Sequence, residues 1–336
     1  MNRPKSNGGV VVLSITWLIV CGAMPATSGV LKPGDLVVLD RHAEIHRVDP
    51  ITGQKLLLSS DGFLTDGYSQ GVAIDSNGDL LVTVSVTNRS VTIFPFGRVV
   101  RIDPDTGSQS LAAQTFPMAG ASGIAIDRSG NYIVAALRDK KILSTDPTTR
   151  AESVLVLAGA AQFATRLLFD DCGDLITDGH STLVRTHLKT GSQTMISEKR
   201  KIHPFGISLD DHGDLIVLDR LPSYLGSAQV IRMDPFTGDS TTINSDPILG
   251  FPSALAVGTD GTIFVGATGE PNPFADDGED NLVRVDPETG EHFVLTKLGR
   301  ITDIAVVPEI TDRRERWKKK RRCRKRRMRS HRYGKR

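Results

Sequence analysis

Three short segments of this 336-residue chain place an aspartate directly after an apolar stretch, with a histidine or an arginine within two residues of it. They are Asp40 with His42, Asp178 with His180, and Asp219 with Arg220. Carboxylates and imidazoles that converge could hold a divalent cation or act as general acid and base. Alternatively, each aspartate accepts hydrogen bonds from nearby backbone amides and caps the connection that follows it. The sequence leaves both interpretations open.

A further candidate overlaps the first segment. His42, Glu44 and His46 alternate along an expected strand, so their side chains would share one side of it, and zinc accepts all three as ligands. The alternative comes from the internal repeats, in which apolar residues fill the position of His46, namely Val100, Val184, Ile231 and Val283. On that comparison His46 is a packed structural histidine.

One repeated pattern runs through the chain and decides where these side chains lie. Its first half is an apolar segment, a tight turn and a second apolar segment, as in 71–82 and 123–134, with weaker copies at 166–177, 206–217 and 254–265. Its second half reads Arg-x-Asp-Pro-x-Thr-Gly, as in 47–53 and 101–107. A period of about 40–50 residues with four strands per unit is typical of a β-propeller blade. The pattern predicts an all-β protein.

Two incomplete copies of the pattern lie at the ends of the repeat region. Residues 34–38 have no apolar segment before them, and residues 302–307 have no turn and partner segment after them. Each supplies what the other lacks, so the C-terminal segment would pair with the first strand and leave no open sheet edge. This predicts a six-bladed β-propeller over residues 30–309, with blade 1 closed by the C-terminal strand.

The repeats resemble a known family. The segment His203-Pro-Phe-Gly-Ile-Ser-Leu-Asp-Asp-His-Gly-Asp-Leu-Ile-Val217 is very similar to the NHL-type repeat, as are the copies that begin at Gly71 and Gly123. The resemblance covers nearly the whole ring. It implies a fold related to that of streptogramin lyase-like and gluconolactonase-like propellers, among which binding scaffolds also occur. The metal and catalytic signatures of those enzymes do not align here, so no catalytic residue is carried over.

The two faces of the expected ring differ in character. Tight turns such as 75–79, 170–174 and 210–214 project from one face. They look like calcium loops, but each is too short to supply six oxygen ligands. We interpret them as turns in which aspartate caps the backbone and glycine takes the left-handed position.

The opposite face gathers connections of variable length, which is where function is usually added to a conserved scaffold. This face surrounds the mouth of the central channel, to which Tyr68, Gln70 and Arg166 also belong. The candidate ligand-binding residues at this mouth are Asp40, His42, Asp178, His180, His203, Asp219, Arg220 and Asp303.

The N-terminus has the pattern of a targeting segment. Arg3 and Lys5 precede an apolar run at 10–20, and small residues at 26–28 suit cleavage before residue 29. Residues 1–28 are therefore expected to be a signal peptide, and the mature protein to be secreted or periplasmic without a transmembrane segment. Export would allow a bridge between Cys172 and Cys323, but nothing in their spacing requires one. We expect two free thiols.

Positive charge is concentrated at the C-terminus. Residues 313–336 hold 16 Lys and Arg against the single acid Glu315, whereas the whole chain carries a net charge of only +2. This segment has too few apolar residues to offset the chain entropy of folding, so residues 310–336 are expected to be a basic tail that is disordered when alone. Anionic lipid head groups, acidic polysaccharide or the protein's own acidic face would suit it. Nucleic acid would also suit it, but conflicts with export.

These features predict an exported, monomeric β-propeller that acts as a binding or interaction scaffold. An unidentified protein or small-molecule ligand would bind at the channel mouth, and the tail would bind an anionic surface or polymer. The alternative is a metal-dependent lyase or lactonase-type hydrolase with its site at the channel mouth. No cofactor is expected for the scaffold, and a divalent cation such as calcium is expected for the enzyme.

Overall fold

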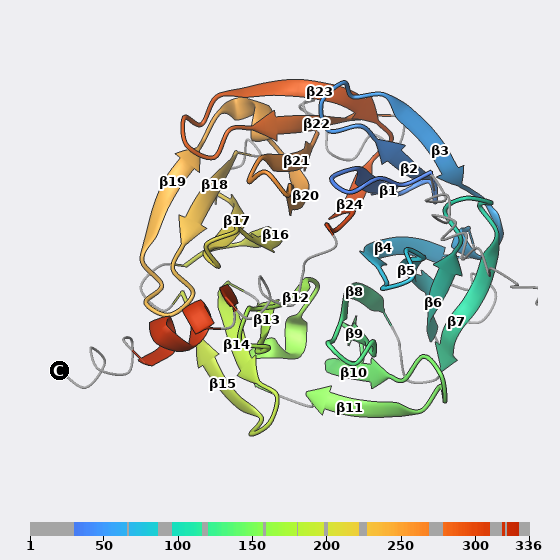
Figure 1. Ribbon diagram of the computed structural model, residues 1–336, viewed down its shortest axis with the longest axis horizontal. Coiled ribbons are helices and arrows are strands. Elements are labelled where there is room, and N and C mark those ends of the chain that lie inside the picture. The colour runs from blue at the N-terminus through green and yellow to red at the C-terminus, as the bar shows by residue number, and fades with distance from the viewer. Residues whose placement is uncertain are drawn as a thin grey trace, which may run out of the picture.

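A computed structural model of the chain contains six four-stranded antiparallel sheets arranged as blades around one axis (Figure 1). The structure describes residues 30–65, 67–86, 96–115, 120–156, 159–179, 181–197, 201–221, 227–268, 278–309, 318–319 and 321–328. The predicted signal peptide lies outside these residues. Among the described residues, we find no helix with the length and hydropathy of a membrane span.

Each blade runs from an inner strand at the axis to an outer strand at the rim. Blade 1 consists of β24 (Ile301–Val306), β1 (Leu36–Asp40), β2 (Ile45–Val48) and β3 (Lys55–Ser59). Blade 2 consists of β4 (Gly67–Ile74), β5 (Leu80–Val86), β6 (Phe96–Ile102) and β7 (Gln109–Thr115). Blade 3 consists of β8 (Ala121–Ile126), β9 (Tyr132–Ala136), β10 (Lys141–Thr145) and β11 (Glu152–Val156). Blade 4 consists of β12 (Leu167–Phe169), β13 (Leu175–Asp178), β14 (Leu183–His187) and β15 (Ser192–Met195). Blade 5 consists of β16 (Pro204–Leu209), β17 (Leu215–Arg220), β18 (Ala228–Met233) and β19 (Ser240–Asn244). Blade 6 consists of β20 (Pro252–Val257), β21 (Ile263–Ala267), β22 (Asp280–Val285) and β23 (His292–Leu298). Three short 3-10 helices connect blades, η1 (Gly62–Leu64), η2 (Ala160–Phe163) and η3 (Pro247–Leu249).

The predicted ring closure is confirmed. Strand β24 pairs antiparallel with β1, with Leu36 opposite Val306. Beyond the strands, the Gly34 amide donates to the Val307 carbonyl at 2.9 Å and the Val307 amide donates to the Asp35 carbonyl at 2.8 Å. The two ends of the repeat region therefore share one sheet, and blade 1 has no unpaired inner edge.

The hydrophobic core lies between adjacent blades. The second strands β1, β9 and β21 are buried along their whole length, whereas the outer strand β11 is mostly exposed or half-buried. One core cluster joins Val37 and Leu39 of blade 1 to Val82 and Val84 of blade 2. Because each blade covers its neighbour in this way, the ring holds the ends of its strands, and the candidate residues there, in fixed positions.

The tight turns are stabilised as the sequence predicts. In the turn of blade 2, Asp75 Oδ1 accepts from the amides of Asn77 at 2.8 Å and Asp79 at 3.1 Å, and Gly78 has a φ of 90°. The second oxygen of Asp75 accepts from Arg101 Nη1 at 3.0 Å. This pairing links the two halves of the repeat, because Arg101 is the first residue of the Arg-x-Asp-Pro pattern. The carboxylate is therefore occupied by protein donors.

The cysteines correct one expectation. Cys172 and Cys323 form a disulfide across a sequence separation of 151 residues, so the expected two free thiols are wrong. The ring explains the pairing, because the turn that carries Cys172 projects from the face at which β24 ends and the tail begins. Against this face residues 321–328 are helical, which differs from the disorder expected for the tail alone. The helix lies beside blades 4 and 5 (Figure 1).

Candidate functional site

Asp178 is used to hold the backbone of its own blade. It ends β13, is only 4% exposed, and its Oδ1 accepts from the amides of Thr165 at 2.6 Å and Arg166 at 2.7 Å. The Thr165 hydroxyl donates to the other oxygen. Burial raises the pKa of the Asp178 carboxyl, and the hydrogen bonds from Thr165 and Arg166 oppose that rise. Both oxygens therefore have protein donors.

Asp219 and Asp40 follow the same principle. Asp219 accepts from the His203 amide at 2.8 Å and from Gln229 Nε2 at 2.9 Å. Asp40 is buried and accepts from the Glu44 amide at 2.9 Å, which closes the connection between β1 and β2. Burial raises the pKa of Asp40, and the hydrogen bond from the Glu44 amide opposes that rise. The capping interpretation of these aspartates is supported by their geometry.

Blade 6 contains a further buried aspartate that caps the backbone in this way and that the alignment of the repeats missed. Asp280 accepts from Thr268 Oγ1 at 2.6 Å and from the Ile301 amide at 2.9 Å, and so ties blade 6 to the inner strand of blade 1. It lies at the start of β22 rather than at the end of a second strand, which is why alignment with Asp178 did not identify it. Burial raises its pKa.

The other candidate side chains are more open. His42 and His203 are exposed, and Arg220 lies over the Phe205 ring at 5.6 Å from its centroid. His180 lies outside the described residues. The structure thus places an exposed histidine in blades 1 and 5, and the backbone of His203, not its ring, contacts Asp219.

The predicted zinc arrangement is only partly assembled. Among the described residues, Asp40, Glu44 and His46 have ligand atoms within 4.8 Å of one another, and His42 is not in this group. Burial lowers the pKa of His46, and the nearby Glu44 carboxylate opposes that effect. His46 Nε2 lies 3.7 Å from Glu44 Oε2, and its Nδ1 is buried without a hydrogen-bond partner. These features are those of a packed histidine in β2, as the repeat comparison indicated.

A serine motif also falls within the ring. Gly67-Tyr-Ser-Gln-Gly71 matches the Gly-x-Ser-x-Gly spacing of a nucleophile elbow, in which serine sits on a sharp turn between a strand and a helix. Here the whole segment lies inside β4. Ser69 is only 1% exposed, and its hydroxyl donates to the Leu64 carbonyl at 3.5 Å. The spacing therefore does not produce an exposed nucleophile.

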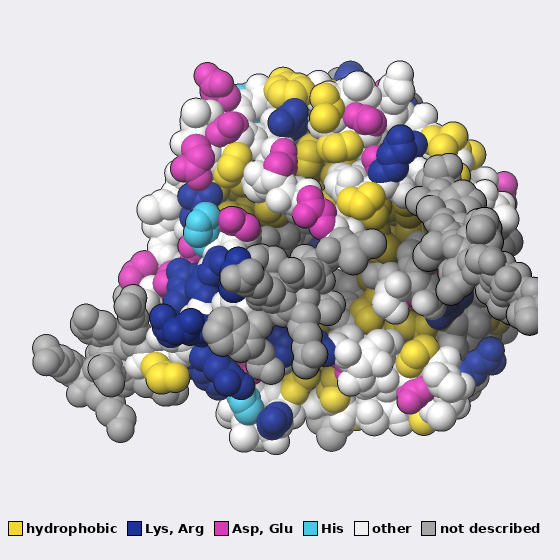
Figure 2. Space-filling model, viewed as in Figure 1, with side chains coloured by type: hydrophobic (Ala, Val, Ile, Leu, Met, Phe, Trp, Pro, Cys, Tyr) yellow, Lys and Arg dark blue, Asp and Glu magenta, His cyan; other side chains and the backbone are white. Residues whose placement is uncertain are grey.

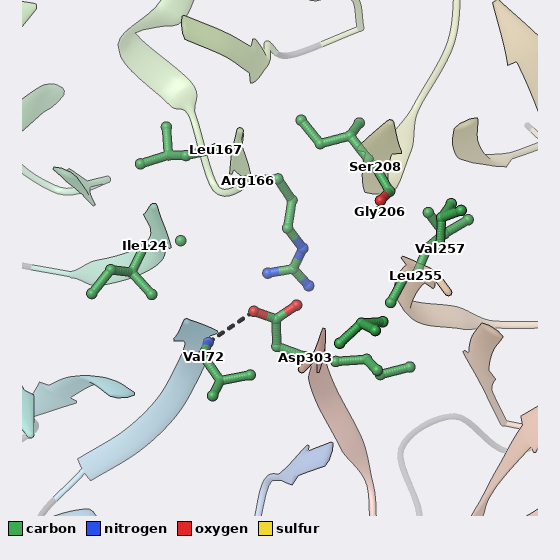
Figure 3. A pocket seen from close by; sticks show the side chains of 14 residues that line it. Val72, Ile124, Arg166, Leu167, Gly206, Ser208, Leu255, Val257 and Asp303 are labelled. Atoms are coloured by element: carbon green, nitrogen blue, oxygen red, sulfur yellow. Dashed lines mark hydrogen bonds between the residues drawn. The ribbon is translucent and has the colours of Figure 1, made fainter. Parts of the chain in front are cut away.

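The centre of the ring contains two charged side chains that face one another, Arg166 and Asp303 (Figure 3). The Arg166 guanidinium donates to three backbone carbonyls of other blades, those of Phe205 at 3.1 Å, Ser253 at 2.9 Å and Thr302 at 3.0 Å. Asp303 Oδ2 accepts from the Val72 amide at 2.9 Å. Burial raises the pKa of Asp303, and the Arg166 charge opposes that rise.

The two charged residues line a cavity of about 290 Å³ in the channel. All six inner strands contribute to its wall, mostly with apolar side chains such as Ile124, Leu167 and Leu255. Although most of the lining side chains are apolar, the exposed surface of the cavity is mostly polar, and its volume is just below the usual range of ligand pockets. Of the sequence candidates, Asp303 lines this cavity.

Repeat alignment explains why two charges meet there. Arg166 and Asp303 occupy the position that Gly71, Gly123, Gly206 and Ala254 fill in the other blades. A Cβ on Gly123 would lie 2.5 Å from the Thr165 carbonyl oxygen, and one on Gly206 would lie 2.5 Å from Leu255 Cβ. The inner strands lie so close to one another that, in four blades, the residue at this position has no long side chain. Arg166 and Asp303 fill the space that remains.

A second candidate site is the C-terminal helix. Arg326 Nη2 donates to the carboxylates of Asp214 and Asp234. Arg327 Nη1 lies 3.4 Å from Asp174 Oδ2, and Arg322 donates to the Asp211 carbonyl. Figure 2 shows Lys and Arg side chains gathered over this part of the ring. Charge pairing and the disulfide thus attach a strongly basic segment to the acidic turns of blades 4 and 5.

Comparison with solved structures agrees with the fold. The chain is similar to one in the crystal structure of a nidogen/laminin complex, with a TM-score of 0.63 and 12% identity over 81% of this chain and 98% of that one. It is also similar to the streptogramin B lyase structure, with a TM-score of 0.54 and 14% identity over 79% of this chain and 84% of that one. No protein-family model and no curated protein matches the sequence.

These similarities confirm the six-bladed fold and the expected likeness, in fold alone, to lyase-type propellers. At 12% and 14% identity they show the fold alone, and one fold hosts both a protein found in a complex and a lyase. The function must therefore be argued from the residues of this chain.

Proposed function

We propose that the protein is an exported binding scaffold whose basic helix attaches it to an anionic partner. The observation that carries this proposal is the fixed position of the helix. A segment that would be disordered alone is held on the ring by the Cys172–Cys323 disulfide and by the pairing of Arg326 with Asp214 and Asp234. Exposed cations on a rigid support are suited to binding polyanions.

The state of the candidate acids supports a scaffold over an enzyme. A general acid or base needs a proton site that the substrate can reach, and a metal ligand needs a free lone pair. Asp178 and Asp219 are buried and accept hydrogen bonds from backbone amides and side-chain donors instead. In a metal-dependent lyase or lactonase, the metal ion or substrate would have to reach these buried carboxylates and compete with the donors that already bind them.

The disulfide supports export. Structural disulfides persist in secreted and periplasmic proteins and are rare in the reducing cytosol. The pairing of Cys172 with Cys323 therefore agrees with the signal peptide expected at residues 1–28. A secreted or periplasmic location also favours extracellular polyanions over nucleic acid as partners.

The proposal is tested by comparing the full mature chain with a chain that ends at Glu309. Both are loaded on dextran sulfate resin and eluted with a salt gradient. We expect the full chain to be retained at physiological salt and the shortened chain to pass through. Equal retention of both chains would overturn the role of the tail.

The enzyme alternative is tested by metal analysis of the same preparations. We expect less than one equivalent of calcium or zinc per chain, in the native protein and in Asp178→Asn alike. One tightly bound equivalent that is lost in Asp178→Asn but kept in the control Glu288→Gln, an exposed acid outside the candidate site, would favour the enzyme.

A further inference from the structure

The C-terminal helix has two different faces. Residues 322, 323, 326 and 327 are buried or half-buried against the ring, and residues 321, 324, 325 and 328 are exposed. This is the spacing of a helix with one covered side, since positions three and four apart share a face. The exposed face carries Arg321, Arg324 and Lys325, which we call the outward row.

The ring neutralises the covered face. Asp174, Asp214 and Asp234 pair with Arg326 and Arg327 there. Asp171 also lies close, where burial raises its pKa and the charges of Lys319 and Arg322 oppose the rise. Within the described residues, neither Arg324 nor Lys325 forms an ion pair with the ring. Positive charge therefore remains on the side of the helix that faces solvent.

The attachment also fixes the shape of the outward row. Cys323 is in the middle of the helix and is bonded to the turn of blade 4, while Arg326 one turn later is paired with blade 5. Successive turns of a helix are about 5.4 Å apart, so the three cations form a short row along its axis. A row ordered before binding loses less entropy when a ligand arrives.

The chemistry of the outward row selects one class of partner. A helix that lies on a membrane needs an apolar face with large side chains, and here the exposed face has Met328 as its one described apolar residue. Nucleic acid is disfavoured by the oxidising compartment that the disulfide implies. A linear acidic polysaccharide fits, because its repeated sulfate or carboxylate groups match a row of cations and need no apolar contact.

We propose that Arg321, Arg324 and Lys325 bind an acidic polysaccharide, and that the Cys172–Cys323 disulfide holds these three side chains in a row. This inference rests on the proposed function, in which the tail binds a polyanion. It goes further by naming the helix face, the polymer class and the bond that maintains the site.

The test compares two triple variants that remove the same charge. One is Arg321→Ala, Arg324→Ala and Lys325→Ala in the outward row, and the control is Arg332→Ala, Lys335→Ala and Arg336→Ala near the chain end. Dissociation constants for soluble dextran sulfate are measured at physiological salt. We expect the first variant to bind on the order of 10- to 100-fold more weakly than the native chain, because each cation near an anionic surface contributes severalfold. We expect the control to weaken binding severalfold less.

A separate experiment tests the role of the disulfide. Cys172→Ser with Cys323→Ser keeps every charge, and we expect it to weaken dextran sulfate binding severalfold through loss of order. Unchanged affinity would overturn the role of the bond.

The remaining outcomes separate this inference from the proposed function. Equal losses in the two triple variants would overturn the outward row while the tail remained the binding element. Full retention by the chain that ends at Glu309 would overturn the proposed function itself. Tighter binding to phosphatidylserine vesicles or to single-stranded DNA than to dextran sulfate would overturn the polysaccharide as partner.

Discussion

Arg166 and Asp303 face each other at the centre of the ring and connect blades that are distant in sequence. Arg166 donates to backbone carbonyls in the inner strands of blades 5, 6 and 1, and Asp303 accepts from the backbone of blade 2. Together with their own blades, the two residues thus contact five of the six.

Replacement of Arg166 should destabilise the whole ring. Arg166→Met keeps the length of the side chain but leaves three carbonyls without their donor and Asp303 without its counter-charge. Both residues are half-buried, and leaving such polar groups without their partner costs roughly 1–3 kcal/mol. Urea unfolding should show a loss of that size, and Arg220→Met, a stacked arginine at the channel mouth, should lose less than about 1 kcal/mol. A loss of less than about 1 kcal/mol in both variants would mean that the Arg166 guanidinium does not hold the blades together.

Asp303 should make stability depend on pH in a defined direction. Its pKa is raised in the folded state, so the folded protein binds more protons than the unfolded chain between the ordinary and the raised value. The resulting stabilisation is complete below the ordinary pKa and is lost as the pH rises through the folded pKa. An amide at this position cannot titrate, so Asp303→Asn should gain stability relative to the native protein as pH rises from about 4 to about 8. A difference between the two unfolding free energies that stays constant over this range would exclude the effect.

The fold could be predicted from the sequence because its signals repeat. Residues 34–38 and 302–307 each lack a partner, and the repeat pattern states what that partner must be. The same alignment also contained the central pair, since Arg166 and Asp303 interrupt a position that Gly71 and Gly123 fill. Their contacts could not be predicted, because the carbonyls that Arg166 binds belong to blades that are brought near only by ring closure.

The capping aspartates should contribute to stability without supporting metal binding. Asp178→Ala removes the acceptor for the Thr165 and Arg166 amides and leaves these buried donors unsatisfied. Each such donor costs about 1–3 kcal/mol, so chemical denaturation should show a loss of at least about 2 kcal/mol. His203→Ala, an exposed control at the same mouth, should stay within about 0.5 kcal/mol of the native protein. An Asp178→Ala protein as stable as the native chain would argue that the carboxylate is kept for binding.

The positions of the candidate aspartates could be predicted from the sequence, but the groups that bind their carboxylates could not. Equivalent placement of Asp40, Asp178 and Asp219 followed from the repeat, and the structure buries all three. Whether a carboxylate binds a ligand or a backbone amide depends on residues 12 to 16 positions upstream, such as Arg166 and His203, whose approach is set by packing. The disulfide escaped prediction for the same reason, because 151 residues separate Cys172 from Cys323 in sequence while the ring brings them together.

Reduction of the disulfide should release the basic helix before it unfolds the ring. The core clusters between blades do not include the described residues 318–319 and 321–328, whereas the helix is held by Cys323 and by a few partly exposed ion pairs. Exposed ion pairs contribute at most about 1 kcal/mol each, too little to order a helix of two turns without the covalent bond. Brief trypsin treatment after reduction should therefore cut within residues 313–336 and leave the ring intact, as followed by mass spectrometry.

The matched control for that experiment is the unreduced chain at the same protease ratio. In it, Arg322, Arg326 and Arg327 should be cut more slowly than Arg332, because the first three face the ring and the bond keeps them there. Reduction should abolish the difference. It should also lower the unfolding free energy of the full chain by about 2–4 kcal/mol, since the bond closes a long loop in the unfolded state. Equal cleavage rates at these positions before and after reduction would show that charge pairing alone attaches the helix.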